Sequence, residues 1–160
     1  MKNLIKIALL VLLLGISLYA KNVATVTGLN GKASVQRDAG EVDLNLGDKL
    51  QEKDVIHTQD KTKVQIIFED ETIISIGKNS TFAINEYIFD GKQEPVAKFG
   101  MLKGAMRAIT GKIGKVAPDK FTVKTKTATM GIRGTNFSIL VGEDGSYNAY
   151  CTFGAISVSI

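Results

Sequence analysis

The stretch FTVKTKTATMGIRGTNFSILV, Phe121 to Val141, decides the class of fold. On both sides of its GIRG centre, apolar residues recur at every second position, which is the period of a strand with one buried face. Gly131 and Gly134 stand between these two alternating runs. Two glycines in this arrangement indicate either a loop that cradles a phosphate or a tight corner in a β structure.

The residues around the two glycines favour the corner. A G-x-x-G nucleic-acid clamp needs a helix on each side, and a Walker-type loop needs a lysine before the threonine and a helix after it. Strands are expected on both sides here. We therefore expect Gly131 and Gly134 to adopt backbone conformations that a side chain would forbid. Arg133 is expected to donate to carbonyl groups at the corner, Thr135 to return its hydroxyl to the backbone, and Phe137 to start the next buried face.

The same alternation appears along most of the chain and predicts an all-β fold. Clusters of Gly, Asp and Asn separate the alternating runs, and the Val, Ile and Thr content suits a pleated surface. Residues 97–112 also fit one face of a helix, but their three glycines each disfavour a helix by up to about 1 kcal/mol, so we expect strand and turn there, with room for a short helix. The other expected strands cover residues 63–69, 72–76, 121–127, 136–141, 146–153 and 155–160.

The first twenty residues have a different character. MKNLIKIALLVLLLGISLYA places two lysines before a largely apolar run and ends in small Ala20. This run is too short for a comfortable membrane span and is typical of a cleavable signal peptide. We predict a signal peptide over residues 1–20 and one domain over residues 21–160, with an uncleaved anchor as the alternative. No cysteine directly follows the apolar run, which argues against a lipoprotein. The expected location is the periplasm or the exterior, without stable membrane insertion after cleavage.

Charge differs strongly between segments. Residues 21–160 carry 18 Lys and Arg against 16 Asp and Glu, because Lys2 and Lys6 lie in the predicted signal peptide. Residues 21–97 have a net charge of −4, whereas residues 98–133 have a net charge of +8. A nearly neutral, exported domain does not fit a nucleic-acid-binding protein, so no nucleic-acid partner is expected.

Residues suited to catalysis are few. The chain has one cysteine, Cys151, and one histidine, His57. Cys151 shares its strand parity with Tyr147 and Phe153 and is expected to be a small buried hydrophobe, while His57 lies in a polar run and is expected at the surface. There is no cysteine pair, metal-ligand spacing or catalytic triad in the sequence. We therefore expect a protein that is not an enzyme and needs no cofactor or metal.

The order of motifs resembles the FecR domain family. TKTATMGIRGTNF, Thr125 to Phe137, is similar to the family hallmark Thr-Pro-x-Ala-x-x-x-Val-Arg-Gly-Thr-x-Phe. The resemblance extends over about residues 22–158. Further motifs follow the family's order at Gly31–Val35, Leu46–Leu50, Asp54–Thr58, Val64–Phe68 and Asn79–Ser80.

The sequence departs from the family pattern at three places. Lys126 replaces the hallmark proline, and Lys53 stands where glycine is frequent. Asp70-Glu71 replaces an Asp-Gly hairpin, so a turn wider than two residues is expected there.

The resemblance implies a fold and a function class. The expected architecture is a solenoid-like or rolled stack of short strands, with a β-sandwich or jelly roll as the alternative. FecR-type regulators of TonB-linked uptake in Gram-negative bacteria combine a cytoplasmic anti-sigma segment, a membrane helix, a periplasmic β domain and a C-terminal lobe. This chain resembles the β domain behind a signal peptide, so transcriptional control is not carried over. The expected function is non-catalytic binding of an envelope protein or an anionic glycan, linked to envelope signalling; the alternative is a structural or adhesive surface protein.

Two surfaces are candidates for a partner. Lys120, Lys124 and Lys126 occupy alternate positions and should form a positive stripe that faces away from buried Phe121. The alternative is that the stripe pairs with the acidic N-terminal half, keeps the protein soluble or protects a sheet edge. Residues 155–160 end in alternating apolar positions and would suit strand pairing with a partner, unless they close the domain's own core.

Overall fold

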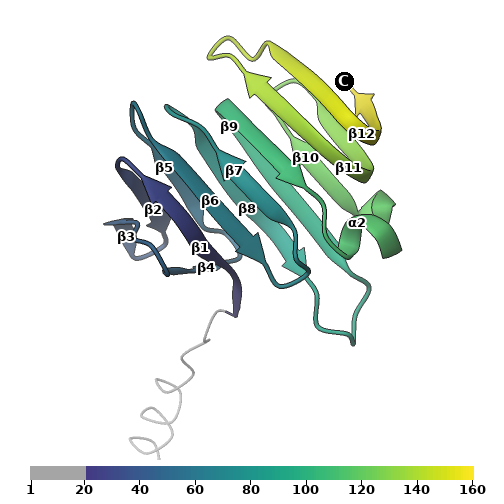
Figure 1. Ribbon diagram of the computed structural model, residues 1–160, viewed down its shortest axis with the longest axis horizontal. Helices are drawn as coiled ribbons and strands as arrows, with labels where there is room; N and C mark the ends of the chain where they lie inside the picture. The colour runs from purple at the N-terminus through teal and green to yellow at the C-terminus, as the bar shows by residue number, and fades with distance from the viewer. Residues whose placement is uncertain (1–20) are drawn as a thin grey trace, which may run out of the picture.

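The computed structural model describes residues 21–160, so the predicted signal peptide lies outside the described residues. Nearly all regular structure in this range is β, and the all-β prediction is confirmed (Figure 1). The strands are β1 (Asn22–Asn30), β2 (Ala33–Arg37), β3 (Gly40–Asp43), β4 (Lys49–Gln51), β5 (Val55–Thr58), β6 (Lys63–Phe68), β7 (Ile73–Ile76), β8 (Thr81–Ile88), β9 (Val96–Ile109), β10 (Phe121–Lys124), β11 (Thr129–Val141) and β12 (Tyr147–Ser159).

The segment that fitted either a helix or a strand is mostly strand. It forms β9, and a single helical turn, α2 (Ile113–Val116), follows it and leads into the 3-10 turn η1 (Pro118–Lys120). In residues 21–160, no helix is long and apolar enough to cross a bilayer. One pair of expected strands merges, because residues 146–153 and 155–160 lie together in β12, and the expected strand over residues 136–141 is the second half of the longer β11.

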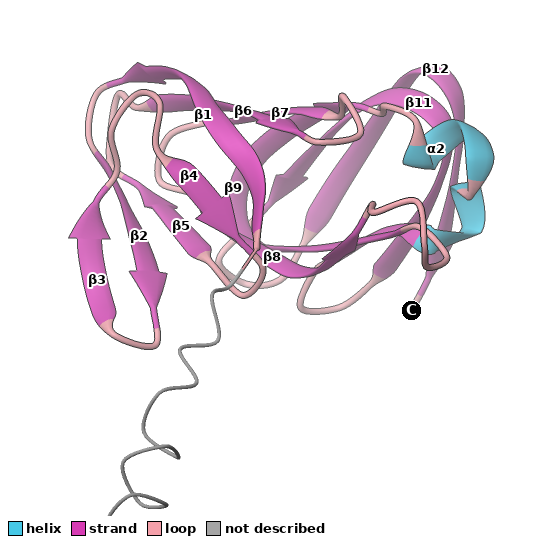
Figure 2. Cartoon of the chain, turned by 90° about the horizontal axis from the view of Figure 1, so that it is seen from below, coloured by secondary structure: helices cyan, strands magenta, loops and turns pink. Residues whose placement is uncertain are grey.

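All strands join one curled sheet, which forms a half-barrel of two facing layers (Figure 2). The strand order along its main path is β3-β2-β5-β8-β9-β7-β6-β1-β4. The long strand β9 passes through both layers: residues 96–103 pair with β8 and residues 97–100 with β10, whereas residues 104–109 pair with β7 and β11. We call the layer with β2, β5, β8 and β10 the first layer, and the layer with β1, β4, β6 and β7 the second layer.

The rolled form is observed, and the solenoid-like form is not. A solenoid stacks parallel strands from successive coils, but nearly all neighbours here are antiparallel, and β9 with β10 is the parallel pair. The sheet is also continuous rather than split into the two separate sheets of a sandwich.

Three glycines lie where β9, β11 and β12 turn from one layer to the other. Gly104, Gly134 and Gly154 have φ angles of 91°, 51° and 90°, which favour a residue without a Cβ atom. A Cβ on Gly104 would lie 2.6 Å from Ser80 Cα, so the neighbouring backbone also requires a glycine there. Glycine at these three positions therefore allows the strands to bend between the two layers.

The core fills the space between the two layers. Its centre is a row of packed aromatic rings. The ring centroid of Phe99 lies 5.0 Å from that of Phe68 in the second layer and 5.4 Å from that of Phe121 in the first. Phe137 continues this row, 6.5 Å from Phe121 and edge-on to it. The alternating apolar residues of the strands thus face one shared interior, as their period predicted.

Candidate binding surfaces

The GIRGTNF corner lies inside β11 and forms the bend predicted for it, with different contributions from its residues. Gly134 has a positive φ, but Gly131 does not and pairs regularly with Thr122 and Ser157. The expectation of a special backbone conformation is therefore confirmed for Gly134 and wrong for Gly131. Phe137 is fully buried, as expected.

The expected side-chain contacts of Arg133 and Thr135 are not formed. The guanidinium of Arg133 points outward to Asp119, with Nη2 3.7 Å from Oδ1, because its strand position faces away from the core. The buried Thr135 hydroxyl has no hydrogen-bond partner within the described residues. The backbone of Thr135 is held instead by Thr110, whose Oγ1 accepts from Thr135 N at 3.0 Å.

The lysine stripe is divided among local contacts. Lys120 lies in η1 and pairs with Glu94 at 3.1 Å, and Lys126 donates to the carbonyl of Glu143 at 3.0 Å. Lys124 is exposed at the end of β10. Since β10 lies between β9 and β11, the lysines do not protect a sheet edge, and the Lys120 pair agrees with the alternative of pairing to the acidic half. The three lysines do not present one continuous positive surface.

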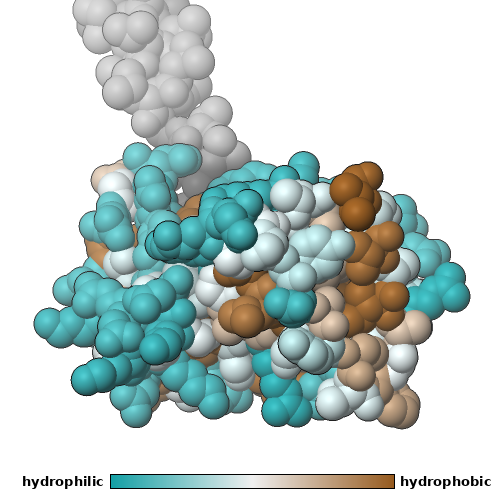
Figure 3. Space-filling model, turned by 90° about the horizontal axis from the view of Figure 1, so that it is seen from above, coloured by the Kyte–Doolittle hydropathy of each residue, from teal (hydrophilic) through white to brown (hydrophobic). Residues whose placement is uncertain are grey.

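The C-terminal strand β12 forms a long open edge of the sheet. It is 13 residues long and forms 11 residue pairs with β11, interrupted by a bulge, and no described strand covers its other edge. Phe153 is 75% exposed, Tyr150 64% and Val158 45%. Figure 3 shows apolar side chains gathered towards the end of the molecule where β10, β11 and β12 lie, and hydrophilic ones at the other end. No charged residue occurs between Tyr147 and Ile160.

Cys151 is exposed, so the prediction that it is buried is wrong. The alternation did predict the correct face of the sheet for Cys151. Cys151 lies opposite buried Phe137 and Ala149 lies opposite buried Ile139, so both point to the interior side. The core nevertheless ends at β11, since Tyr147 and Ile156 are the residues of β12 that pack, partly buried, against it. The face of β12 that points towards the interior therefore remains open to solvent.

His57 contacts two neighbouring strands. His57 is half-buried, with Nδ1 3.2 Å from Thr81 Oγ1 and Nε2 3.4 Å from Gln36 Oε1. Across residues 21–160, no group of three His, Cys, Asp or Glu side chains is arranged to hold a metal ion.

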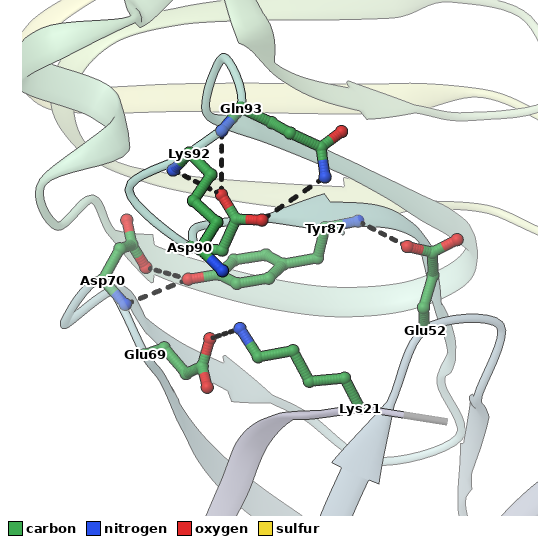
Figure 4. A network of polar contacts seen from close by, with 8 residues as sticks. All are labelled: Lys21, Glu52, Glu69, Asp70, Tyr87, Asp90, Lys92 and Gln93. Carbon is green, nitrogen blue, oxygen red and sulfur yellow. Dashed lines mark hydrogen bonds and ion pairs between the residues drawn. The ribbon is translucent and has the colours of Figure 1, made fainter. Parts of the chain in front are cut away.

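A buried Asp70–Tyr87 network ties the β6–β7 hairpin to β8 and α2 (Figure 4). Tyr87 Oη donates to Asp70 Oδ1 at 2.9 Å and accepts from Asp70 N at 3.0 Å. Thr72 Oγ1 and Ile113 N donate to Asp70 Oδ2 at 2.8 and 3.1 Å. Burial, and after it the neighbouring Asp70, raises the pKa of the Tyr87 phenol. A fully bonded Asp70 side chain and a phenol that keeps its proton stabilise the fold at this position.

Figure 4 also shows polar contacts at the surface around this network. Lys21 pairs with Glu69 at 2.8 Å. Asp90 accepts from the backbone N–H groups of Gln93 and Lys92, both at 2.9 Å, and these bonds lower the pKa of its carboxyl.

A second buried carboxylate, Asp54, anchors the β2–β3 hairpin. Arg37 Nε and Nη2 donate to its two oxygens at 2.7 and 2.8 Å, and Gln51 N donates to it at 2.9 Å. The bond to Asp54 is the main cause that raises the pKa of Arg37. Sequence reasoning missed both buried carboxylates, because an aspartate in a turn-like run is more often exposed.

Comparison with known proteins identifies the family of the chain. A family model described as "FecR protein" matches residues 54–157, which is most of the described chain. The chain belongs to the FecR family. Curated proteins yielded no match to it. A solved structure described as "Cell surface anchoring domain" is 32% identical, with a TM-score of 0.37, and the match covers 38% of this chain and 82% of that one.

The departures from the FecR pattern place side chains in unusual backbone conformations. Lys53 and Glu71 have φ angles of 72° and 70°, in the region that glycine tolerates best. The hairpin at Glu71 has a three-residue loop, since Phe68 N donates to Thr72 O, and the expectation of a wider turn is confirmed. Glu71 pairs with Lys112 at 2.7 Å, and Lys112 lowers the pKa of its exposed carboxyl.

Proposed function

We propose that this FecR-family domain is a non-catalytic binding module of the cell envelope that receives a strand from a partner protein along β12. The observation that carries the proposal is the open edge of β12, which is long, uncharged and carries exposed Tyr150, Phe153 and Val158. Membership of the FecR family supports a location and role in the envelope.

The composition of β12 is unusual for an edge that faces water permanently. Natural edge strands are short, or carry lysine, proline or a bulge that prevents pairing with another chain. A bulge lies at the Asn136–Phe153 region, yet on either side of it β12 pairs regularly with β11, and its outer edge has no lysine or proline. In β-augmentation such an edge supplies backbone hydrogen bonds, and alternate side chains supply specificity. Exposed Phe153 and Val158 would provide apolar contacts to the added strand.

Self-association is a second candidate, because two β12 strands could pair with each other. An uncharged edge has no like-charge repulsion against a second copy of itself. In that case the protein would be a structural or adhesive component, with several copies joined through β12.

The test places charge on the edge. Phe153→Lys and Val158→Lys leave the core intact because both side chains are exposed, so the thermal midpoint should change little. Thr27→Lys, at an exposed position of β1, is the matched control. Crosslinking of the protein in its own envelope should yield a partner adduct with wild type and Thr27→Lys, and none with the β12 variants. An undiminished adduct in the β12 variants would disprove strand addition, and sedimentation of the purified protein distinguishes a foreign partner from a second copy.

A further inference from the structure

An open groove of about 450 Å³ lies on the outer face of the second layer, away from the β12 edge. It crosses the ends of β6 and β7 and the second half of β9, strands that lie side by side in Figure 1. Small residues form the floor of the groove. A Cβ on Gly77 would lie 3.3 Å from Ala105 Cβ, so larger side chains at these two positions would fill the groove. Its floor is formed by Gly77 and Ala105 and by the backbone of Ile76 and Met106, whose side chains face the core, and Ser75 and Ser138 lie beside it.

The rim of the groove is strongly positive. Lys61, Lys63, Lys78 and Arg107 all line it and are all exposed. Asp60 lies 3.6 Å from Lys78, and within residues 21–160 no carboxylate lies within ion-pair distance of the other three cations. Opposite charge on a ligand would complement this excess of positive charge, and the open setting makes the attraction sensitive to salt.

Arg107 is held in position for a ligand. Its Nε donates to Asn136 Oδ1 at 3.0 Å, which fixes the plane of the guanidinium. No hydrogen bond joins its terminal nitrogens to another residue of the described range. A planar fork with free donors matches the two oxygens of a carboxylate.

Arg107 also belongs to a polar row that crosses five strands. In the register of the sheet, Gln65 lies opposite Ser75, Ser75 opposite Arg107, Arg107 opposite Ser138, and Ser138 opposite Tyr150. With neighbouring strands about 4.8 Å apart, the row is about 19 Å long. It offers an amide, two hydroxyls, a cation and an exposed aromatic ring in line.

We propose that this groove and row bind an acidic oligosaccharide that carries carboxylate groups, such as a chain of uronic acids. Arg107 and the lysines would pair with the carboxylates, Ser75 and Ser138 would bond sugar hydroxyls, and Tyr150 would contact the apolar face of a terminal ring.

An acidic peptide fits this surface less well. Strands β6, β7, β9 and β11 each pair on both sides, so their backbones offer no hydrogen bonds to an added strand. Recognition must come from side chains, and the row supplies the mixture of hydroxyl, amide and cation that sugars use. This proposal is independent of strand addition at β12, because Tyr150 would contact the sugar through its side chain, and the free backbone edge of β12 would stay open.

The test is calorimetric titration of the purified protein with oligouronates at low and at physiological salt. Binding is expected with wild type and should weaken as salt rises. Arg107→Gln and Lys63→Gln should each weaken it by about tenfold or more, the usual effect of losing one charge-assisted contact. Lys124→Gln, on the outer face of the first layer, is the matched control and should bind as wild type. Thermal midpoints confirm that each variant is folded.

Several outcomes would overturn the proposal. The first is that oligouronate does not bind. The second is that a neutral oligosaccharide binds as tightly as the oligouronate. The third is that Lys124→Gln loses as much affinity for the oligouronate as Arg107→Gln and Lys63→Gln. Equal or tighter binding by a polyglutamate peptide would reassign the groove to acidic proteins. Amide chemical-shift changes confined to Ser75 and Ser138 and their neighbours support the assignment, and changes confined to β12 contradict it.

Discussion

At the corner where β11 and β12 turn between the layers, we expect three Gly→Ala substitutions to lower the free energy of unfolding by different amounts. In Gly154→Ala, the new Cβ would lie 2.5 Å from Thr135 Cγ2 and 2.6 Å from the carbonyl oxygens of Arg133 and Gly134, at a φ of 90°. A backbone clash together with a disfavoured φ should cost about 3 kcal/mol or more of the free energy of unfolding.

The two glycines of the GIRG motif should respond less. In Gly134→Ala the nearest atom to the new Cβ, Gly114 O, is 3.7 Å away. The left-handed backbone conformation alone should therefore lower the free energy of unfolding, by about 1 kcal/mol. Gly131→Ala places its Cβ 2.7 Å from the Ser157 hydroxyl, which can rotate away, and the φ is ordinary. Its cost should stay within about 0.5 kcal/mol.

The assay is urea unfolding of the three variants beside wild type, followed by circular dichroism, with equal m values as the check that the transition is unchanged. The expected order of destabilisation is Gly154→Ala, then Gly134→Ala, then Gly131→Ala. Equal destabilisation by Gly131→Ala and Gly154→Ala would refute the reasoning, because it would mean that the corner does not depend on local φ and backbone contacts.

Two further predictions concern groups in unusual environments, and one concerns the thiol. Because burial raises the pKa of Tyr87, its contribution to stability is present below the unfolded-state value near pH 10 and is lost as pH rises above it. Tyr87→Phe should cost about 1–3 kcal/mol at neutral pH, because it leaves buried Asp70 N without its acceptor and removes one donor from Asp70 Oδ1. Alkaline titration should show a shallower loss of stability above about pH 10 than in wild type, and an unchanged slope would contradict this. Lys53→Gly relieves a positive φ and should raise stability by up to about 1 kcal/mol in urea unfolding, while Lys49→Gly in β4 should lower it. Cys151 should react with a maleimide in the native protein about as fast as in urea, and strong protection would show that β12 is covered.

Local patterns predicted the class of fold well. Alternation predicted β6, β7, β10 and the second half of β11, because a half-buried strand repeats every two residues wherever it lies in the sheet. The corner at Gly134 was also predicted from the sequence, since few residues adopt a positive φ without cost. The curl into two layers was not specified, because it depends on which strands pair across the sheet and not on any single strand.

The candidate surfaces depend on long-range pairing and were less predictable. Cys151 has the parity of a core residue, and its exposure follows from the position of β12 at the end of the sheet. Lys120 and Lys126 alternate in sequence, but the contacts that engage them come from Glu94 and Glu143, in other parts of the chain. Arg107 and Ser138 come together through the register of β9 and β11.

The most direct test of the account maps the partner contact along the chain in living cells. A photoreactive amino acid is placed in turn at Phe153 and Val158 on β12, at Lys124 on β10 and at Val42 on β3, all of them exposed positions. Strand addition predicts adducts from the two β12 positions, and none from β10 or β3. Adducts from Lys124 or Val42 with none from β12 would contradict the claim that this domain works by offering its last strand to a partner.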